Sequence, residues 1–222
     1  MDNTNIVREY YDNGQIRKEE WYKEGTRHRE GGPAFIEYYK SGQISEEIWY
    51  KDGQQHKEEG PTHVYYNEQG QKKMEWWFKD GKLHRENGPA YIEYYSGEKK
   101  KIERWYKDNT FHREDGPAII KYYLNGKVQE EKWYKNNKLH RENGPATIYY
   151  NNNGKISSEW WYKDDKLHRE DGPAITAYED NGKIKRYSYY IEDKELTEEE
   201  FLKRKKINNL LNEKKQAKKT IL

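Results

Sequence analysis

The residues Lys138-Leu139-His140-Arg141-Glu142-Asn143-Gly144-Pro145-Ala146 are one copy of a unit that recurs through most of the chain. All 6 prolines lie 28 residues apart, a histidine lies five residues before each proline, and a tryptophan lies seven residues before each histidine. The three columns are Pro33, Pro61, Pro89, Pro117, Pro145 and Pro173; His28, His56, His84, His112, His140 and His168; and Trp21, Trp49, Trp77, Trp105, Trp133 and Trp161. A fixed period of this length indicates a repeat architecture.

The composition is unusually polar for a folded domain. Of the 222 residues, 37% are charged and 32% hydrophobic, and the mean hydropathy is −1.52, values typical of disordered chains. Against this, 22 tyrosines and 8 tryptophans recur in register, and each ring can bury a large area. The net charge of +2 does not suggest a polyanion-binding surface over the whole molecule, and the lack of cysteine excludes disulfides and thiolate metal sites. We therefore expect one folded, elongated array.

The N-terminal sequence MDNTNIVREYYDNG has no apolar core of signal-peptide length. No stretch is apolar enough to cross a bilayer as a helix. These observations predict a cytoplasmic protein with no transmembrane segment.

Each unit divides into two strand-like halves, typified by residues 15–23 and 33–39. Both halves alternate and favour aromatic or β-branched residues, whereas glycine and proline at the boundaries disfavour helix. Asp52-Gly53, Asp80-Gly81, Asn125-Gly126 and Asn181-Gly182 are hairpin-type dipeptides. The predicted fold is all-β: an elongated single-sheet antiparallel meander of six to seven 28-residue hairpin repeats, about twelve strands or slightly more. At roughly 4.8 Å between strands, such a sheet is about 55–60 Å long.

Small irregularities occur in the turns between the halves. Tyr65-Tyr66 and Tyr149-Tyr150 come one residue early in the repeat, which predicts turns one residue longer at NEQG and NNNG, and Ser96-Gly97 predicts a shorter turn. Because the Trp–His–Pro phase continues through them, we expect loop stacking as well as strand pairing to set the register.

Comparison of the copies separates scaffold from variable positions. Glutamate lies two residues before each repeat tryptophan and lysine two residues after it. The residue before the tryptophan and the second residue after the proline differ from copy to copy. We therefore expect residues that are specific to the function at these two positions. The predicted protein-binding residues are Ile48, Trp76, Arg104, Lys132, Trp160, Phe35, His63 and Tyr91.

The repeat ends near residue 196, where Tyr189 replaces the tryptophan and Leu196 the histidine. Thr197 and Glu200 form a capping-box pattern, and apolar residues follow at Phe201, Leu202, Ile207, Leu210 and Leu211. We therefore expect an array over residues 1–196 and a basic helix over 197–222 that caps its last face. The segment from Lys203 to Leu222 has eight basic residues and one acidic residue.

The pattern G-x-x-x-x-E-x-W-Y-K-(D)-G-x-x-H resembles MORN-type repeats and is most similar to the bacterial YwqK-type antitoxin repeats, from Gly14 to about Tyr190. The resemblance implies a single-layer antiparallel sheet and a scaffolding or binding role, antitoxin-like, in a viral or bacterial protein. The unit here is longer and continues as His-Arg-Glu-x-Gly-Pro-Ala.

Several patterns that suggest chemistry have a structural interpretation. Neighbouring histidines would lie about 9–10 Å apart, too far to share a metal ion, and each is expected to tether its loop to backbone. The repeated His-Arg-Glu is expected to form a charge network between repeats, because a catalytic site is normally unique. The glycine before each proline is expected to allow a positive φ or a close approach. We predict no catalytic residues, no metal and no cofactor.

The sequence thus favours a non-enzymatic scaffold that binds another protein, as an antitoxin-like or viral inhibitor of one target. The alternative is a nucleic-acid-binding protein that uses Lys203, Arg204, Lys205 and Lys206 of the basic helix. Two further alternatives are binding to a membrane surface and formation of a homodimer.

Overall fold

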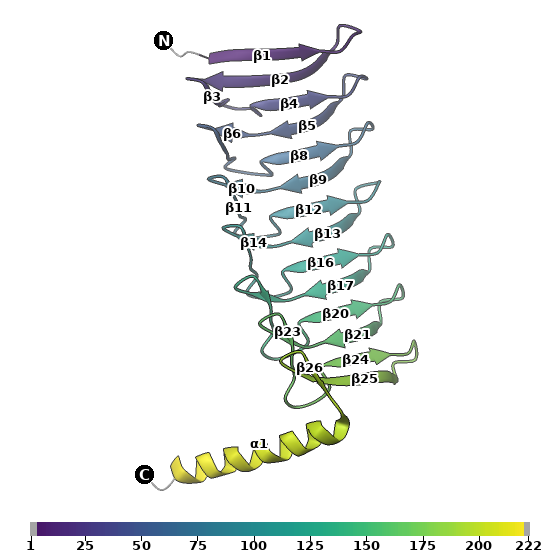
Figure 1. Ribbon diagram of the computed structural model, residues 1–222. Coiled ribbons are helices and arrows are strands. Elements are labelled where there is room, and N and C mark those ends of the chain that lie inside the picture. The colour runs from purple at the N-terminus through teal and green to yellow at the C-terminus, as the bar shows by residue number, and fades with distance from the viewer. Residues whose placement is uncertain (1–3, 220–222) are drawn as a thin grey trace. The chain divides into compact units, whose positions relative to one another are not determined.

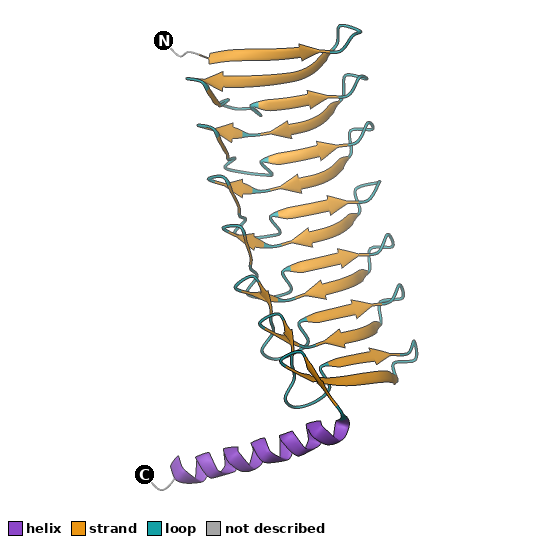
Figure 2. Cartoon of the chain, viewed as in Figure 1, coloured by secondary structure: helices purple, strands orange, loops and turns teal. Residues whose placement is uncertain are grey.

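The computed structural model describes residues 4–219, and the chain forms two compact units, Met1–Val128 and Gln129–Leu222. In each unit the main strands follow one another as an antiparallel meander (Figure 1). The one helix among the described residues, α1 (Glu198–Lys219), ends the chain (Figure 2). The predicted all-β meander with a C-terminal helix is confirmed.

The first unit has nine main strands. They are β1 (Thr4–Tyr10), β2 (Ile16–Lys23), β4 (Phe35–Tyr38), β5 (Ile44–Ile48), β8 (His63–Tyr66), β9 (Lys72–Trp76), β12 (Tyr91–Tyr94), β13 (Lys100–Arg104) and β16 (Ile119–Tyr122). Short strands accompany them: β3 (Thr26–Arg27), β6 (Tyr50–Lys51), β7 (Gln54–Gln55), β10 (Phe78–Lys79), β11 (Lys82–Leu83), β14 (Tyr106–Lys107) and β15 (Thr110–Phe111).

The second unit repeats this plan. Its main strands are β17 (Val128–Lys132), β20 (Thr147–Tyr150), β21 (Ile156–Trp160), β24 (Ile175–Tyr178), β25 (Ile184–Ile191) and β26 (Lys194–Leu196). Its short strands are β18 (Tyr134–Lys135), β19 (Lys138–Leu139), β22 (Tyr162–Lys163) and β23 (Lys166–Leu167).

The repeat tryptophan interrupts the first strand of most units. The predicted single strand over residues 15–23 is seen in β2, but the next copy is divided into β5 and β6 on either side of Trp49. The Trp49 backbone N–H donates to the carbonyl of Thr62 (2.7 Å), while its own carbonyl accepts from His56 (3.2 Å). The tryptophan is therefore where the chain changes partners, from the meander to a small hairpin of its own.

These small hairpins have two-residue turns. Both central residues have positive φ, as at Asp52-Gly53 (50° and 77°) and Asn136-Asn137 (50° and 65°), which is the pattern of a type I′ turn. Two of the predicted hairpin dipeptides, Asp52-Gly53 and Asp80-Gly81, lie in such turns. The other two, which end at Gly126 and Gly182, lie in the longer turns between the halves.

The longer turns all have the same length, so the expected insertions and deletion were wrong. Asn67 N–H donates to Gln71 O just as Tyr39 does to Gln43 and Tyr95 to Lys99. Tyr66 keeps the phase of Tyr38, and the apparent shift arises because another tyrosine happens to precede it. In the turn at Ser96-Gly97 the glycine lies one position earlier, and both Gly97 and Glu98 have positive φ (83° and 59°).

A narrow core runs across the strands. In the first unit the register aligns Glu19, Ile36, Glu47, Val64, Glu75, Ile92, Glu103 and Ile120 in one row. The aliphatic members Ile36, Val64 and Ile92 are buried, and so are Ala34 and Ala90 of the Gly-Pro-Ala segments. Small and medium side chains at these positions let the loop pack closely against the sheet.

Each repeat tryptophan is covered by the arginine or lysine that follows the repeat histidine. The six cations lie 3.8–4.2 Å from the ring centroids: Arg29, Lys57, Arg85, Arg113, Arg141 and Arg169. Each arginine also donates to the carbonyl of the next proline at 3.2–3.3 Å. Cation–π contact and a charge-assisted hydrogen bond therefore fold the loop over the ring.

The glycine before the proline makes room for this arginine. A Cβ built on Gly116 would lie 2.7 Å from the Arg113 guanidinium, and at Gly32, Gly88, Gly144 and Gly172 the distance is 2.9–3.1 Å. Gly116 is outside the left-handed region, so the requirement there is space. At Gly60, which faces Lys57, the distance is 3.5 Å.

Helix α1 begins with the predicted capping box. The Glu200 N–H donates to Thr197 Oγ1 (3.2 Å), and the Thr197 N–H donates to Glu200 Oε2 (2.9 Å). Phe201 is buried and stacks on Tyr189 at 4.3 Å between centroids, whereas Leu202, Ile207, Leu210 and Leu211 are at least half exposed. The helix thus covers the last repeat with its first turns.

We predict that Gly116→Ala lowers the free energy of unfolding by about 1–3 kcal/mol, because the new methyl group displaces the Arg113 guanidinium from Trp105. The same change in an Arg113→Lys background should cost clearly less, because the lysine at the equivalent position 57 leaves more space. Urea unfolding of the four proteins of this double-mutant cycle measures the coupling. Equal costs in both backgrounds would contradict the role given to the glycine.

Candidate functional site

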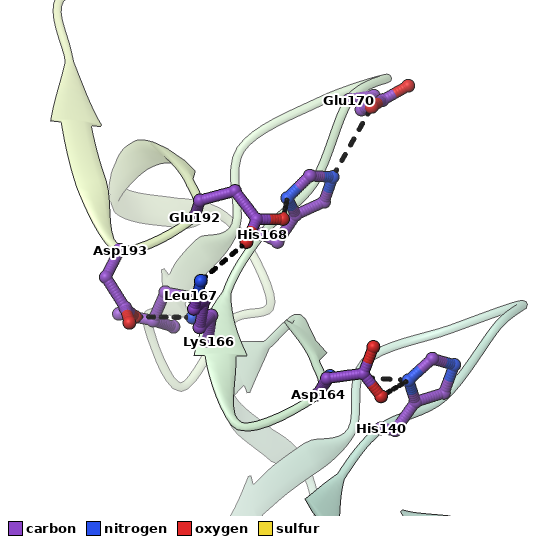
Figure 3. A network of polar contacts seen from close by, with 8 residues as sticks. All are labelled: His140, Asp164, Lys166, Leu167, His168, Glu170, Glu192 and Asp193. Carbon is purple, nitrogen blue, oxygen red and sulfur yellow. Dashed lines mark hydrogen bonds and ion pairs between the residues drawn. The ribbon is translucent and has the colours of Figure 1, made fainter.

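Five of the six repeat histidines reach the small hairpin of the next repeat. Their Nδ1 atoms lie 2.8–3.3 Å from a carboxylate oxygen in the type I′ turn that follows. The pairs are His28–Asp52, His56–Asp80, His84–Asp108, His140–Asp164 and His168–Glu192. Figure 3 shows two of them. We expected backbone partners; the Asp52 and Asp164 amides do lie 3.2–3.3 Å from Nδ1, but the main partner is a side chain one repeat away.

The second residue of the turn makes a further bond between repeats. The backbone N–H groups of Asn109, Asp165 and Asp193 donate to the carbonyls of Leu83, Leu139 and Leu167 at 2.9–3.0 Å. Their side-chain oxygens accept from the N–H groups of the same leucines at 2.7–2.8 Å, as Figure 3 shows for Asp193. The turns are therefore stacked on one another from repeat to repeat.

The expected charge network between arginines and their neighbouring glutamates was wrong. The arginines lie on the tryptophans, and Arg113 and Arg169 pair with Asp115 and Asp171 of their own loops at 3.0 and 2.7 Å. The neighbouring glutamate faces its own histidine instead, as at Glu86, whose Oε1 is 3.0 Å from His84 Nε2. The contacts of these loops with the turn of the next repeat come from the histidines instead.

Successive loops leave a cleft between them, and equivalent clefts recur along the chain. We call the clefts starting at His28, His56, His84 and His140 the cleft row; their volumes are about 410, 590, 690 and 510 Å³. The cleft at His84 has walls from two His-Arg-Glu loops and a floor from the hairpin between them. Its residues are His84, Arg85, Glu86, Asn87, Gly88, Trp105, Tyr106, Lys107, His112, Arg113, Glu114 and Asp115.

The cleft row presents both signs of charge. In the cleft at His84, the side chains of Glu86 and Glu114 are 70% and 85% exposed, and Lys107 is exposed on the floor. The guanidinium groups of Arg85 and Arg113 stack on Trp77 and Trp105, and both arginines also line the wall of the cleft. Such a surface suits a polar, charged ligand better than an apolar one.

A ladder of tyrosines and buried or half-buried glutamates runs across the strands of the sheet. Six tyrosine hydroxyls donate to the glutamates of the preceding repeat at 2.5–2.9 Å: Tyr38, Tyr66, Tyr94, Tyr122, Tyr150 and Tyr178. Burial, and then the hydrogen bond to glutamate, raise the pKa of Tyr38 and of Tyr178 to about 12. Burial acts to raise the pKa of Glu19, but the bonds from Arg8 and Tyr38 outweigh it and hold that pKa below its usual value.

The predicted protein-binding residues lie in one cross-strand row. In the first unit the register places Phe35, Ile48, His63, Trp76, Tyr91 and Arg104 on consecutive strands, opposite one another. In the second unit Lys132 and Trp160 flank Thr147. Ile48 and Tyr91 are buried and the other six are half-buried, so this row is packed more than it is open.

The middle of this row holds a cluster that the sequence did not reveal. The His63 ring stacks on Trp76 at 4.7 Å, and its Nε2 lies 2.7 Å from Glu46 Oε1. Burial acts to raise the pKa of Glu46, but bonds from His63 and Tyr65 hold it below its usual value. The contact between Glu46 and His63 could not be predicted from the sequence, because it depends on the register between two paired strands.

The basic residues predicted for nucleic-acid binding lie on the first turns of α1. Lys203, Arg204 and Lys206 are exposed, whereas Lys205 donates from Nζ to the carbonyl of Asp171 at 2.9 Å. Three of the four therefore face solvent.

Among the side chains that the structure describes, those of residues 4–211 and 213, no group of three or more is placed to hold a metal ion. Nor does any helix of this described region have the length and apolar character to cross a membrane. No protein-family model and no curated protein matches the sequence.

We predict that Tyr94→Phe lowers the free energy of unfolding by about 1–3 kcal/mol, because the buried carboxylate of Glu75, 3% exposed, loses a donor. Tyr10→Phe is the control: Tyr10 is 59% exposed, and the change should stay within about 0.5 kcal/mol. Urea unfolding at neutral pH makes the comparison.

The same ladder predicts loss of stability at alkaline pH. A tyrosine whose folded pKa is raised contributes its full stability below its unfolded pKa of about 10 and loses it as pH rises through the folded value. For Tyr38 and Tyr178, whose folded pKa is about 12, the free energy of unfolding should therefore fall as the pH rises from about 10 to about 12. Unfolding free energies that stay constant across this window would contradict the ladder.

Proposed function

We propose that this protein is a non-enzymatic repeat module that binds an extended segment of another protein along the three successive clefts of the first unit, those at His28, His56 and His84. The observation that carries the proposal is the recurrence of one cleft, with the same residue types on its floor and walls, in successive repeats. A surface of this kind offers the same contact at regular intervals, as repeat proteins with extended binding surfaces do.

The spacing of the clefts fits an extended chain. Two strands per repeat at roughly 4.8 Å each place neighbouring clefts about 9.6 Å apart, and three residues of extended peptide span about 10 Å. A bound segment would thus present every third side chain to an equivalent cleft. Because each cleft has exposed glutamates and a lysine, we infer a partner segment in which charged residues of both signs recur.

The groups that could suggest catalysis have structural partners. Five of the six repeat histidines lie against turn carboxylates, the arginines contact tryptophans and proline carbonyls, and the ladder glutamates accept from tyrosines. The resemblance to YwqK-type antitoxin repeats supports a binding role in which one protein target is inhibited.

The test uses peptides that are selected from a random display library for binding to the full-length protein. We predict that replacing Lys51, Lys79 and Lys107 together by glutamate weakens the binding of these peptides by roughly tenfold or more, or about 1.4 kcal/mol. These exposed lysines line three successive clefts of the first unit.

The matched control replaces Lys40, Lys73 and Lys99 by glutamate. These lysines are also exposed and carry the same charge, but they lie outside the cleft row. Equal losses in the two triple variants would indicate a general charge effect and contradict the cleft row.

A second candidate function is nucleic-acid binding by α1, favoured by the exposure of Lys203, Arg204 and Lys206. If it is correct, changing these three residues to alanine should reduce the slope of log affinity for a labelled oligonucleotide against log salt by about 2–3. Fluorescence anisotropy over a salt series measures this slope. Wild-type protein that does not bind the oligonucleotide even at low salt would contradict this candidate.

A further inference from the structure

The outer edge of β25 is open over half of the strand. β26 pairs only with Tyr189, Tyr190 and Ile191, so residues 184–188 have β24 on one side and no strand on the other within the described chain. Ile184 and Tyr187 are 57% and 45% exposed, with α1 in place. An exposed strand edge with apolar side chains is a template for pairing with another strand.

β1 is a second open edge. In residues 4–219 it pairs only with β2, and Ile6 and Val7 are 41% and 40% exposed. Figure 1 shows β1 as the first strand of its unit and β25 near the end of the other. Most of the large exposed apolar residues of the strands belong to these two edges.

The repeat phase makes the two edges complementary. Residues 186–188 occupy the phase of residues 18–20, which pair with residues 35–37 of β4. The same pairing recurs one repeat before β25, where Ser158, Glu159 and Trp160 face Ala177, Thr176 and Ile175. Residues 7–9 of β1 lie 28 positions before residues 35–37. β1 therefore occupies the same position in the repeat as the strand that would pair with the open edge of β25.

We propose that β25 of one molecule binds β1 of a second copy and continues the meander between molecules. The pairing follows the register inside the chain: Arg186 lies opposite Glu9, Tyr187 opposite Arg8, and Ser188 opposite Val7 of the second copy. The proposal is independent of the function of the cleft row.

Charge supports this register. Lys185 and Arg186 are exposed, and within residues 4–219 neither has an ion-pair partner. In the first repeat Arg17, at the phase of Lys185, lies 3.8 Å from Glu37, at the phase of Glu9. Docking therefore brings an acidic residue to two unpaired basic ones, and cross-strand pairs of opposite charge stabilise a sheet.

The contact differs from a two-fold dimer. Because β25 meets β1 and not itself, each bound copy leaves another β25 and another β1 free, and association continues in one direction. A strand-edge contact is small, so we expect assembly that depends on protein concentration.

The absence of native cysteine allows a direct test with the full chain. Val7→Cys and Ser188→Cys are made in separate molecules, mixed and oxidised, because facing residues of paired strands lie within disulfide range. We expect a covalent dimer from the mixture and little from either variant alone. A chain with both changes should give a ladder of dimers, trimers and longer species, and the wild type should gain mass with concentration in sedimentation.

Two results would overturn the proposal. One is equal cross-linking of Val7→Cys with itself, which would indicate two-fold pairing of β1 edges; the other is no cross-link from the mixture, with the wild type monomeric at every concentration. Charge reversal gives an independent check: Arg186→Glu and Glu9→Lys should each lose self-association, and mixing them should restore it. Loss that mixing does not repair contradicts the register, provided that circular dichroism shows both variants folded.

Discussion

The stacking of one cation on one tryptophan determines the form of each repeat, and in five of the six copies that cation is a guanidinium. The arginine needs the ring eight residues before it, a glycine three residues after it and a proline carbonyl one residue further on. These requirements explain why His-Arg-Glu-x-Gly-Pro stays together as a block. By holding the loop against the sheet, the contact also directs the histidine toward the next turn and leaves the cleft between consecutive loops.

Much of the fold could be predicted because its signals are local. The 28-residue period, the alternation and the turn dipeptides each indicate hairpins without knowledge of distant contacts. The division of the strand at Trp49 could not be predicted, since Trp-Tyr-Lys favours a strand on either side of the break. The error at Tyr65-Tyr66 has a different cause: residue identity was used to infer phase, whereas the backbone bonds of the turn determine it.

The candidate site was less accessible to prediction. The strand pairing places the variable residues on one row, which the sequence did not indicate. Their exposure depends on what packs against them, as His63 between Tyr65 and Trp76 illustrates. The cleft row involves residues that every copy repeats, and these were interpreted as scaffold alone. A repeated residue can serve both purposes, because the loop that it stabilises forms the wall of a cleft.

Neighbouring repeats are joined at three levels: the stacked turns, the loops over the tryptophans and the paired strands. In the last repeat, other residues provide the turn contact and the cover over the ring. Glu192 supplies the turn carboxylate for His168, and Phe201 of α1 stacks on Tyr189 where an arginine would cover a tryptophan. Only the strand level has no substitute along residues 184–188. A helix can replace a loop by covering a ring, but it cannot supply the row of backbone donors and acceptors that an open strand edge requires.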